Sequence, residues 1–253
     1  MSRATGTSVT QLLSLDLEFC HDVTDLAPLV RLARLESLRL SAQEITDVSP
    51  LAKLKRLRVL EMPGCRGVSR ISPLTGLTEL RRLDLTACGG VRDFSALAVL
   101  PNLTSLGLPP QASTEDLQML RERGTLANLT ELNLVGCAGV TDLRPLEGLT
   151  EITSADLYGC SRLQDLGPLS SLMALTTLSL EGCGRVTDLS PLAKLPNLRS
   201  LNLSYCGGLT NLDELAGLTS LEELRVEGTT RRLKDAAFEL HKLLPRCRVS
   251  GDH

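Results

Sequence analysis

The stretch LSLEGCGRVTDLSPLAKLPNL, residues 178–198, decides the fold because it returns almost unchanged elsewhere in the chain. Residues 132–152, two periods of 23 residues earlier, read LNLVGCAGVTDLRPLEGLTEI, with the same Gly-Cys pair, the same V-T-D-L and the same Pro-Leu. Self-similarity at a fixed period of this size is the signature of a solenoid, in which short structural units stack on one another. We therefore expect a repeat architecture over most of the 253 residues.

Ten units follow the pattern L-x-x-L-x-L-x-x-C. They begin at Leu12, Leu35, Leu57, Leu80, Leu103, Leu129, Ile152, Leu175, Leu198 and Leu221, with spacings of 22, 23 or 26 residues. The L-x-L alternation predicts a short strand in each unit, with leucines on its inner side and variable residues on its outer side. In the ninth unit, for example, Leu201 and Leu203 should point inward, and Ser200, Asn202 and Ser204 outward.

The segment V-T-D-L-x-P-L after each cysteine predicts a turn across the back of the coil. An aspartate suits the start of a short helical turn because its carboxylate accepts backbone N–H groups, and proline suits the first turn because it needs no N–H donor. The aspartates of this kind are Asp25, Asp47, Asp93, Asp142, Asp165 and Asp188. A ladder of calcium ligands is the alternative interpretation, and capping is favoured over it because it needs no bound ion.

The cysteines follow the same repeat. Seven of the eight occupy one position of the unit, namely Cys20, Cys65, Cys88, Cys137, Cys160, Cys183 and Cys206, while Cys247 lies outside it. No C-x-x-C pair exists and the three histidines, His21, His241 and His253, are scattered, so the spacing disfavours zinc. A thiol is a small apolar group with a weak donor, which suits a buried turn. We interpret the cysteines as a reduced structural ladder.

Composition and charge narrow the function classes. Hydrophobic residues make up 42% and aromatic residues 2%, so leucine must build the core. The net charge of −3 gives no general attraction to nucleic acid or to anionic membranes. No signal peptide and no long apolar segment is recognisable, so we expect a cytoplasmic, intracellular protein without a membrane partner.

Two segments depart from the repeat. The fifth unit has 26 residues and Gln111 in place of cysteine; Ser113 with Asp116 resembles a capping box and Gly124 suits a helix C-cap, so residues 114–123 are expected to form a true helix. Near the C-terminus, Leu233, Ala237, Leu240 and Leu244 share one helical face and predict a capping helix. The expected organisation is one domain over 1–253, with a lead-in at 1–11, repeats at 12–228, and the cap helix and tail at 229–253.

On these motifs the chain resembles the leucine-rich repeat family over residues 12–243. The 22–23-residue unit is similar to the subclass of bacterial internalins and of the eukaryotic phosphatase-regulatory subunit, with Cys where those carry Asn. The wording GCxxVTDLSPL is closest to leucine-rich repeat proteins of trypanosomatids, and cysteine-bearing repeats also occur in F-box ligase subunits. The resemblance implies an α/β solenoid with a curved, concave parallel sheet, a convex side of short helical or 3-10 turns, and a binding function.

No catalytic or cofactor site is recognisable in the sequence. A Ser-His-Asp or Cys-His arrangement needs a histidine in a shaped site, and the three histidines lie in a turn, on the cap and at the last residue. The Gly-Gly and Gly-Arg pairs belong to repeat turns and match no phosphate-binding loop. We therefore expect no enzyme activity, no cofactor and no metal.

The expected binding surface is the concave face of the sheet. Three of the five aromatic residues fall at outward positions, and tyrosine is enriched where interfaces concentrate their binding energy. The predicted partner-binding residues are Phe19, Glu131, Val135, Asp156, Tyr158, Glu181 and Tyr205. Chance placement of three aromatic residues is the alternative.

Charge is segregated along the chain. Residues 31–82 carry eleven Lys or Arg and five Asp or Glu, whereas residues 83–228 carry nine and eighteen. A basic contact surface formed by Lys55, Arg56, Arg81 and Arg82 could touch nucleic acid or an acidic protein, although aromatic residues for base stacking are missing.

The leading hypothesis is a non-catalytic protein–protein interaction module whose concave face binds a protein. Two alternatives stay open: a structural subunit of a large cytoskeletal, axonemal or ribonucleoprotein assembly, and, by resemblance alone, a regulatory subunit of a phosphatase or ubiquitin ligase.

Overall fold

A computed structural model describes residues 9–20 and 22–251. These residues form two compact units that divide between Leu106 and Gly107. The predicted organisation as a single domain stays a prediction, and residues 1–8 of the predicted lead-in at 1–11 lie outside the described residues.

The first unit consists of parallel strands joined by 3-10 helices. Its strands are β1 (Ser14–Leu17), β2 (Ser37–Leu40), β3 (Val59–Glu61) and β4 (Arg82–Asp84), and its 3-10 helices are η1 (Val9–Gln11), η2 (Ala27–Arg31), η3 (Ser49–Lys53), η4 (Ser72–Gly76) and η5 (Ser95–Val99). The strands pair in chain order with equivalent leucines side by side, as in Leu15, Leu38, Leu60 and Leu83. Strand β5 (Ser105–Gly107) spans the point where the units divide.

The second unit repeats this arrangement and adds two α-helices. Its strands are β6 (Glu131–Asn133), β7 (Ser154–Asp156), β8 (Thr177–Ser179), β9 (Ser200–Asn202), β10 (Glu223–Arg225) and β11 (Arg248–Ser250). Its helices are α1 (Thr114–Glu122), η6 (Arg144–Leu146), η7 (Gly167–Ser171), η8 (Ser190–Lys194), η9 (Asp213–Gly217) and α2 (Arg231–Leu243). Strands β6 to β11 pair in parallel and in chain order.

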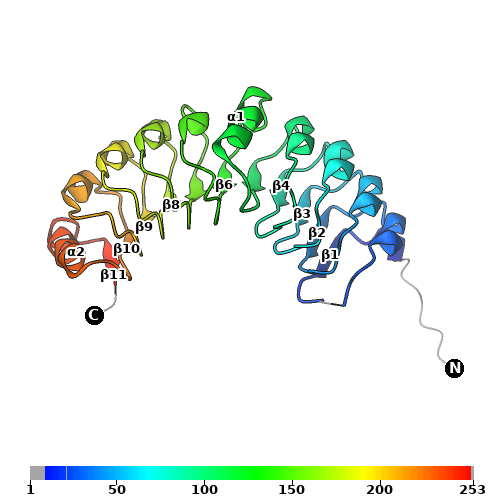
Figure 1. Cartoon of the computed structure of the whole chain (residues 1–253), viewed down its shortest axis with the longest axis horizontal. Helices are drawn as coiled ribbons and strands as arrows, with labels where there is room; N and C mark the ends of the chain where they lie inside the picture. Colours follow the sequence, from blue (N-terminus) through cyan, green and yellow to red (C-terminus); the bar gives the residue numbers. More distant parts are fainter. Residues whose placement is uncertain (1–8, 21, 252–253) are drawn as a thin grey trace. The chain divides into compact units, whose positions relative to one another are not determined.

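Within each unit the strands lie on one side and the helical turns on the other (Figure 1). The leucines of both layers fill the space between them: Leu132, Leu178 and Leu201 on the strands are at most 2% exposed, and so are Leu146 and Leu192 on the turns. The predicted α/β leucine-rich repeat solenoid of parallel strands and 3-10 turns is therefore confirmed. No helix in the described part of the chain has the length and apolar character to cross a membrane.

The predicted turn chemistry is also confirmed. The Oδ1 atom of each of the six aspartates accepts a hydrogen bond from the backbone N–H two residues later, as in Asp165 to Gly167 at 2.7 Å and Asp188 to Ser190 at 2.8 Å. These bonds close a turn immediately before the 3-10 helix, where backbone donors lack partners within the helix. The hydrogen bonds from the backbone N–H of Ser49 and Ser190 lower the pKa of the Asp47 and Asp188 carboxyl groups.

The cysteine ladder is formed by buried, free thiols, with Cys20 the exposed exception. Five of the buried thiols donate to a carbonyl of the preceding coil, as Cys88 does to Met62 O at 3.0 Å and Cys206 to Leu180 O at 3.0 Å; the others are Cys137, Cys160 and Cys183. Burial raises the pKa of Cys88, Cys160 and Cys206 to about 12, which keeps these thiols protonated. The structural role predicted for the ladder follows from these bonds.

The two departures from the repeat form the predicted helices. Helix α1 begins with the expected capping box, since the Ser113 side chain accepts from Asp116 N and Asp116 Oδ2 accepts from Ser113 N at 2.9 Å. Helix α2 buries Leu233, Ala237 and Leu240 against the last coil. Strand β11, which follows α2, was not predicted.

Candidate functional site: the exposed face of the strands

The outer face of the strands in the second unit is built from three parallel rows of side chains. Register places Glu131, Ser154, Thr177, Ser200 and Glu223 in the first row, and Asn133, Asp156, Ser179, Asn202 and Arg225 in the second. Backbone bonds from the turn of each coil to the next define the third row, which is Val135, Tyr158, Glu181, Ser204 and Glu227. Neighbouring members of a row are about 4.8 Å apart, the spacing of paired strands.

Three of the predicted partner-binding residues therefore lie side by side. Val135, Tyr158 and Glu181 are consecutive in the third row, because Gly136 N donates to Tyr158 O and Gly159 N donates to Glu181 O. Asp156 lies in the row beside them, and its Oδ1 accepts from Tyr158 N at 3.0 Å. The Tyr158 side chain is 45% exposed.

Tyr205 projects from the turn two coils beyond Tyr158 and is 57% exposed. Its backbone has φ +57°, in the left-handed region. The position before the cysteine is glycine in four of the seven coils that carry cysteine, as at Gly136, Gly159 and Gly182 with φ of +72° to +75°, because glycine has no Cβ to clash there. A bulky residue in this conformation is strained, and such strain concentrates at functional sites.

The Tyr205 ring lies directly over Gly228, the equivalent residue of the next coil. A Cβ atom on Gly228 would come within 2.2 Å of Tyr205 Cε1, so the ring depends on a glycine below it. The backbone N–H of Tyr205 also donates to Glu227 O at 2.7 Å. The ring is thereby held against the neighbouring coil while its other face stays open to solvent.

The same surface is acidic. Its carboxylates are Glu131, Asp156, Glu181, Glu223 and Glu227, and Arg225 is the cation of the three rows. Arg225 is already engaged by Glu223, with 2.8 Å between its Nη2 and Glu223 Oε1, and Glu181 accepts from Asn202 Nδ2 at 2.7 Å. A basic group would therefore meet more carboxylate than the surface itself neutralises.

One outward prediction is wrong. Ser204 is 2% exposed, because the turn of the next coil closes over it: its hydroxyl accepts from Glu227 N at 3.1 Å, and its own N–H donates to Asn202 Oδ1 at 3.0 Å. The third row consequently has a gap between Glu181 and Glu227, beside the Tyr205 ring.

Phe19 belongs to the first unit. It is 73% exposed and has φ +62°, so it repeats the left-handed aromatic conformation of Tyr205. Ala87 is the third residue with this conformation among the described non-glycine residues. The sequence carried a signal for all three, since each stands immediately before a cysteine where other coils have glycine.

The predicted basic contact surface is spread over different elements. Lys55 and Arg56 follow η3, and Lys55 Nζ donates to Gly76 O at 3.2 Å. Arg82 lies on β4 with its Nε 3.9 Å from Glu61 Oε1, and Arg81 precedes it as an exposed residue. In the same basic segment, Arg39 forms an ion pair with Glu61. Arg58 forms ion pairs with Glu36 and Glu79. Acidic neighbours thus neutralise part of the positive charge that the sequence concentrates here.

No group of three His, Cys, Asp or Glu side chains that could hold a metal ion occurs within residues 9–20 and 22–251. Among the histidines, His241 lies on α2 with its Nδ1 donating to Cys247 O at 2.8 Å, whereas His21 and His253 lie outside the described residues. The absence of a catalytic site stays a prediction.

Comparison with solved structures finds leucine-rich repeat proteins. An internalin (InlF) from Listeria monocytogenes aligns with a TM-score of 0.63 and 25% identity over 95% of this chain and 80% of its own. Internalin C2 (InlC2) from the same species aligns with a TM-score of 0.51 and 27% identity over 88% of this chain and 82% of its own. No protein-family model and no curated protein matches the chain. The chain has a leucine-rich repeat fold.

Proposed function

We propose that this protein is a non-catalytic interaction module that binds a protein partner on the exposed, concave face of its strands. The binding surface is centred on Tyr158 and Tyr205 in the second unit and includes Glu131, Val135, Asp156 and Glu181. Phe19 contributes a second contact from the first unit. We further infer that the protein acts in the cytoplasm and that it is related to the trypanosomatid leucine-rich repeat proteins, which its cysteine-bearing 22–23-residue unit resembles.

The observation that carries this proposal is the left-handed backbone of Tyr205. An aromatic residue at a glycine position is unfavourable for the fold, and it exposes more than half of a large side chain. Tyrosine buries a large area with little loss of side-chain entropy, so a rigidly held ring is well suited to anchor a partner. The strain is thus compensated by binding.

The partner is basic, because the surface around the two tyrosines carries an excess of carboxylates. Opposite charge at an interface mainly accelerates encounter and selects the partner, while the buried aromatic anchors supply the affinity. Association should therefore slow as salt is added, whereas truncation of either tyrosine should raise the dissociation rate.

Affinity capture from the cells that produce the protein, followed by mass spectrometry, tests this function. The wild type is compared with Tyr158→Ala/Tyr205→Ala and with the control Val99→Ala/Met173→Ala, which truncates exposed apolar side chains outside the three rows, on η5 and in the turn after η7. We expect one or two proteins to be retained by the wild type and the control and lost with the tyrosine variant. Equal recovery with all three proteins would rule out the tyrosine surface.

A further inference from the structure

The two end strands leave core positions uncovered that are sealed in every strand between them. In β1, Leu15 and Leu17 are partly exposed, whereas the equivalent Leu38 and Leu40 of β2 are at most 1% exposed. In β11, Val249 is partly exposed, whereas its partner Leu224 in β10 is fully buried. Leucine-rich coils bury these positions by stacking, so each end has the apolar character of an unfilled contact.

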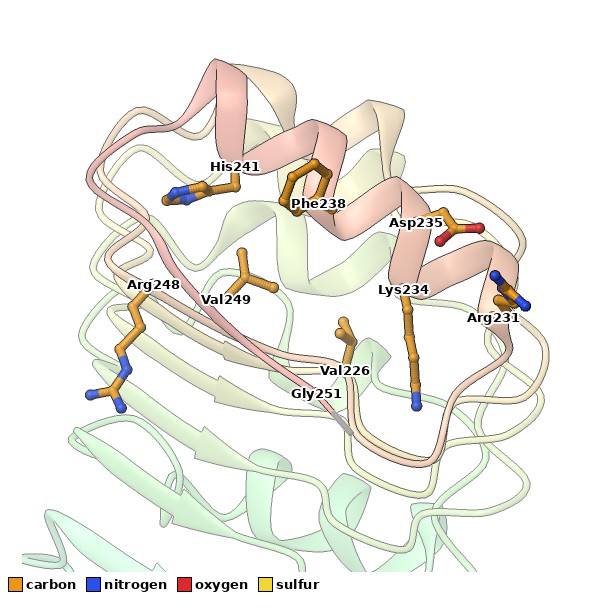
Figure 2. A pocket seen from close by; sticks show the side chains of 9 residues that line it. All are labelled: Val226, Arg231, Lys234, Asp235, Phe238, His241, Arg248, Val249 and Gly251. Carbon is orange, nitrogen blue, oxygen red and sulfur yellow. The ribbon is translucent and has the colours of Figure 1, made fainter. Parts of the chain in front are cut away.

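At the C-terminal end, the uncovered apolar residues line a groove between α2 and β11 with a volume of about 770 Å³. Figure 2 shows Val249 on β11 and Val226, which directly follows β10, on the side that faces α2, with the Phe238 ring above them. Phe238 is 64% exposed although it belongs to the apolar lining. The groove is therefore open to an apolar side chain from outside.

Among residues 9–20 and 22–251, no strand pairs with the outer edge of β1 or of β11. In β11, Arg248 N donates to Glu222 O at 2.7 Å and Ser250 O accepts from Val226 N at 2.9 Å. Because bonding alternates along a parallel strand, the N–H and C=O of Val249 face away from β10. In β1, Ser37 N donates to Leu13 O at 3.0 Å, so the same alternation turns Ser14 and Asp16 away from β2.

The two ends carry opposite charge. Residues 229–251 contain six Lys or Arg and two Asp or Glu, and Arg231, Lys234 and Arg248 line the groove. Residues 9–30 contain four Asp or Glu and no Lys or Arg, and all four carboxylates, which include Asp16 and Glu18, are exposed. The end with exposed leucines, Leu12 at 36% and Leu13 at 47%, is thus the acidic one.

We propose that the groove between α2 and β11 binds the β1 edge of a second copy of this chain. Strand β1 of the second copy continues the parallel ladder beyond β11, its leucines enter the groove, and its carboxylates meet the basic rim. The contact joins two different surfaces, so each complex keeps one free end of either kind and assembly continues past the dimer. The proposal is independent of the partner on the strand face.

Sedimentation velocity of the full chain from micromolar to millimolar concentration tests this contact. We expect species that grow with concentration beyond the dimer and that shrink when salt is added. Leu13→Arg blocks the β1 end, at a position where other coils carry Arg58 and Arg81. Phe238→Glu blocks the groove. Each change should weaken association at least about tenfold, because it replaces an apolar contact with a repelling charge.

Matched controls place the same charges on exposed apolar residues away from both ends of the contact. Val99→Arg lies on η5, and Leu243→Glu lies on α2 outside the groove lining. Both should assemble as the wild type does. Circular dichroism of every variant establishes that the fold is kept.

A mixture of the two blocked proteins gives the sharpest result. Leu13→Arg retains its groove and Phe238→Glu retains its β1 end, so the mixture should form a one-to-one dimer that does not grow. A wild type that stays monomeric at every concentration overturns the proposal and leaves the groove to another protein. The proposal is also overturned if the wild-type species grow with concentration and neither substitution reduces that growth. It is overturned as well if the wild type forms only a dimer that Phe238→Glu abolishes and Leu13→Arg does not, because that result indicates symmetric pairing of two grooves.

Discussion

At the residue scale, the fold depends on which side chains accept an unusual environment. Five of the buried cysteines occupy an apolar site that faces a backbone carbonyl, and their thiols donate a weak hydrogen bond to it, as Cys160 does to Leu134 O at 3.5 Å. Tyr205 instead occupies a backbone conformation that suits glycine. The cysteines therefore stabilise the core, whereas Tyr205 holds a strained backbone conformation at the surface.

The thiols give the protein a specific response to alkaline pH. Burial raises the pKa of Cys88, Cys137, Cys160 and Cys206 to about 12, while thiols in the unfolded chain ionise near about 8.5. Between these values the unfolded state binds fewer protons than the folded state, so stability is complete below pH about 8.5 and falls as pH rises toward 12. Urea unfolding midpoints measured at neutral pH and at pH about 10 should show the decrease.

A Cys160→Ala variant is the control for this response, because it removes one titrating thiol. Its midpoint should depend less steeply on pH over the same interval. An identical dependence in the variant and the wild type would show that other groups cause the loss.

Replacing the strained tyrosine by glycine should separate binding from stability. Tyr205→Gly removes a left-handed non-glycine residue, which is worth about 1 kcal/mol of strain, and it loses only a half-exposed ring. We expect the free energy of unfolding to equal that of the wild type or to exceed it by up to about 1 kcal/mol, while partner binding is lost. A free energy of unfolding that urea denaturation places more than about 1 kcal/mol below that of the wild type contradicts the assignment of strain.

Substitution of Gly228, the glycine below the Tyr205 ring, should affect both stability and partner binding. In Gly228→Ala the new Cβ requires the Tyr205 ring to move, and it also meets a backbone φ of +59°. We expect a loss of about 1 kcal/mol of stability and a weaker partner complex. Gly217→Ala is the matched control, since that glycine has no atom within 4 Å of an added Cβ and no positive φ. Equal effects of the two substitutions would argue against the ring contact.

At the element scale, the coil is defined by what each short segment does at its ends. Six of the described 3-10 helices, η2, η3 and η5 to η8, begin after an aspartate turn, and five of the thiols bond their coil to the preceding one. Helix α1 differs because nine residues need their own cap, and the reciprocal bonds between Ser113 and Asp116 provide it. Helix α2 begins with Thr230, whose hydroxyl accepts from Leu233 N at 3.3 Å.

Removing the α1 cap should destabilise the second unit. Ser113→Ala leaves a backbone N–H of the first turn without its acceptor, and we expect the free energy of unfolding to fall by about 1 kcal/mol. Ser113→Thr keeps a hydroxyl at the same position and should retain most of that stability. Denaturant unfolding of the three proteins decides the matter, and an Ala variant as stable as the Thr variant would mean that the capping box contributes nothing.

At the scale of the whole molecule, the sequence predicts the repeat well because each coil repeats the same inward leucines. The repeated leucine pattern predicted every strand from β1 to β10, and the capping pattern predicted α1 to within one residue. Strand β11 escaped prediction because its Arg-Val-Ser has a single apolar residue, and only the neighbouring β10 supplies the hydrogen bonds that make it a strand.

The candidate site was predictable in position but not in conformation. The period placed Val135, Tyr158 and Glu181 at equivalent positions, which register then brought side by side. The burial of Ser204 depends on how the following turn closes over it, and the ion pairs of Arg39 and Arg58 depend on which coil carries a glutamate alongside. Such contacts arise between coils, where the pattern of a single repeat gives no information.

The most direct test of the central claim is site-specific photocrosslinking in the producing cell. A photoreactive phenylalanine analogue is placed at Tyr158 or Tyr205 on the strand face, and at Val99 on η5 or Met173 in the turn after η7. If a partner is bound on the strand face, the first two positions should crosslink to the same protein and the last two should not. Crosslinks to a partner protein from Val99 or Met173, with none from Tyr158 or Tyr205, would contradict binding on the strand face.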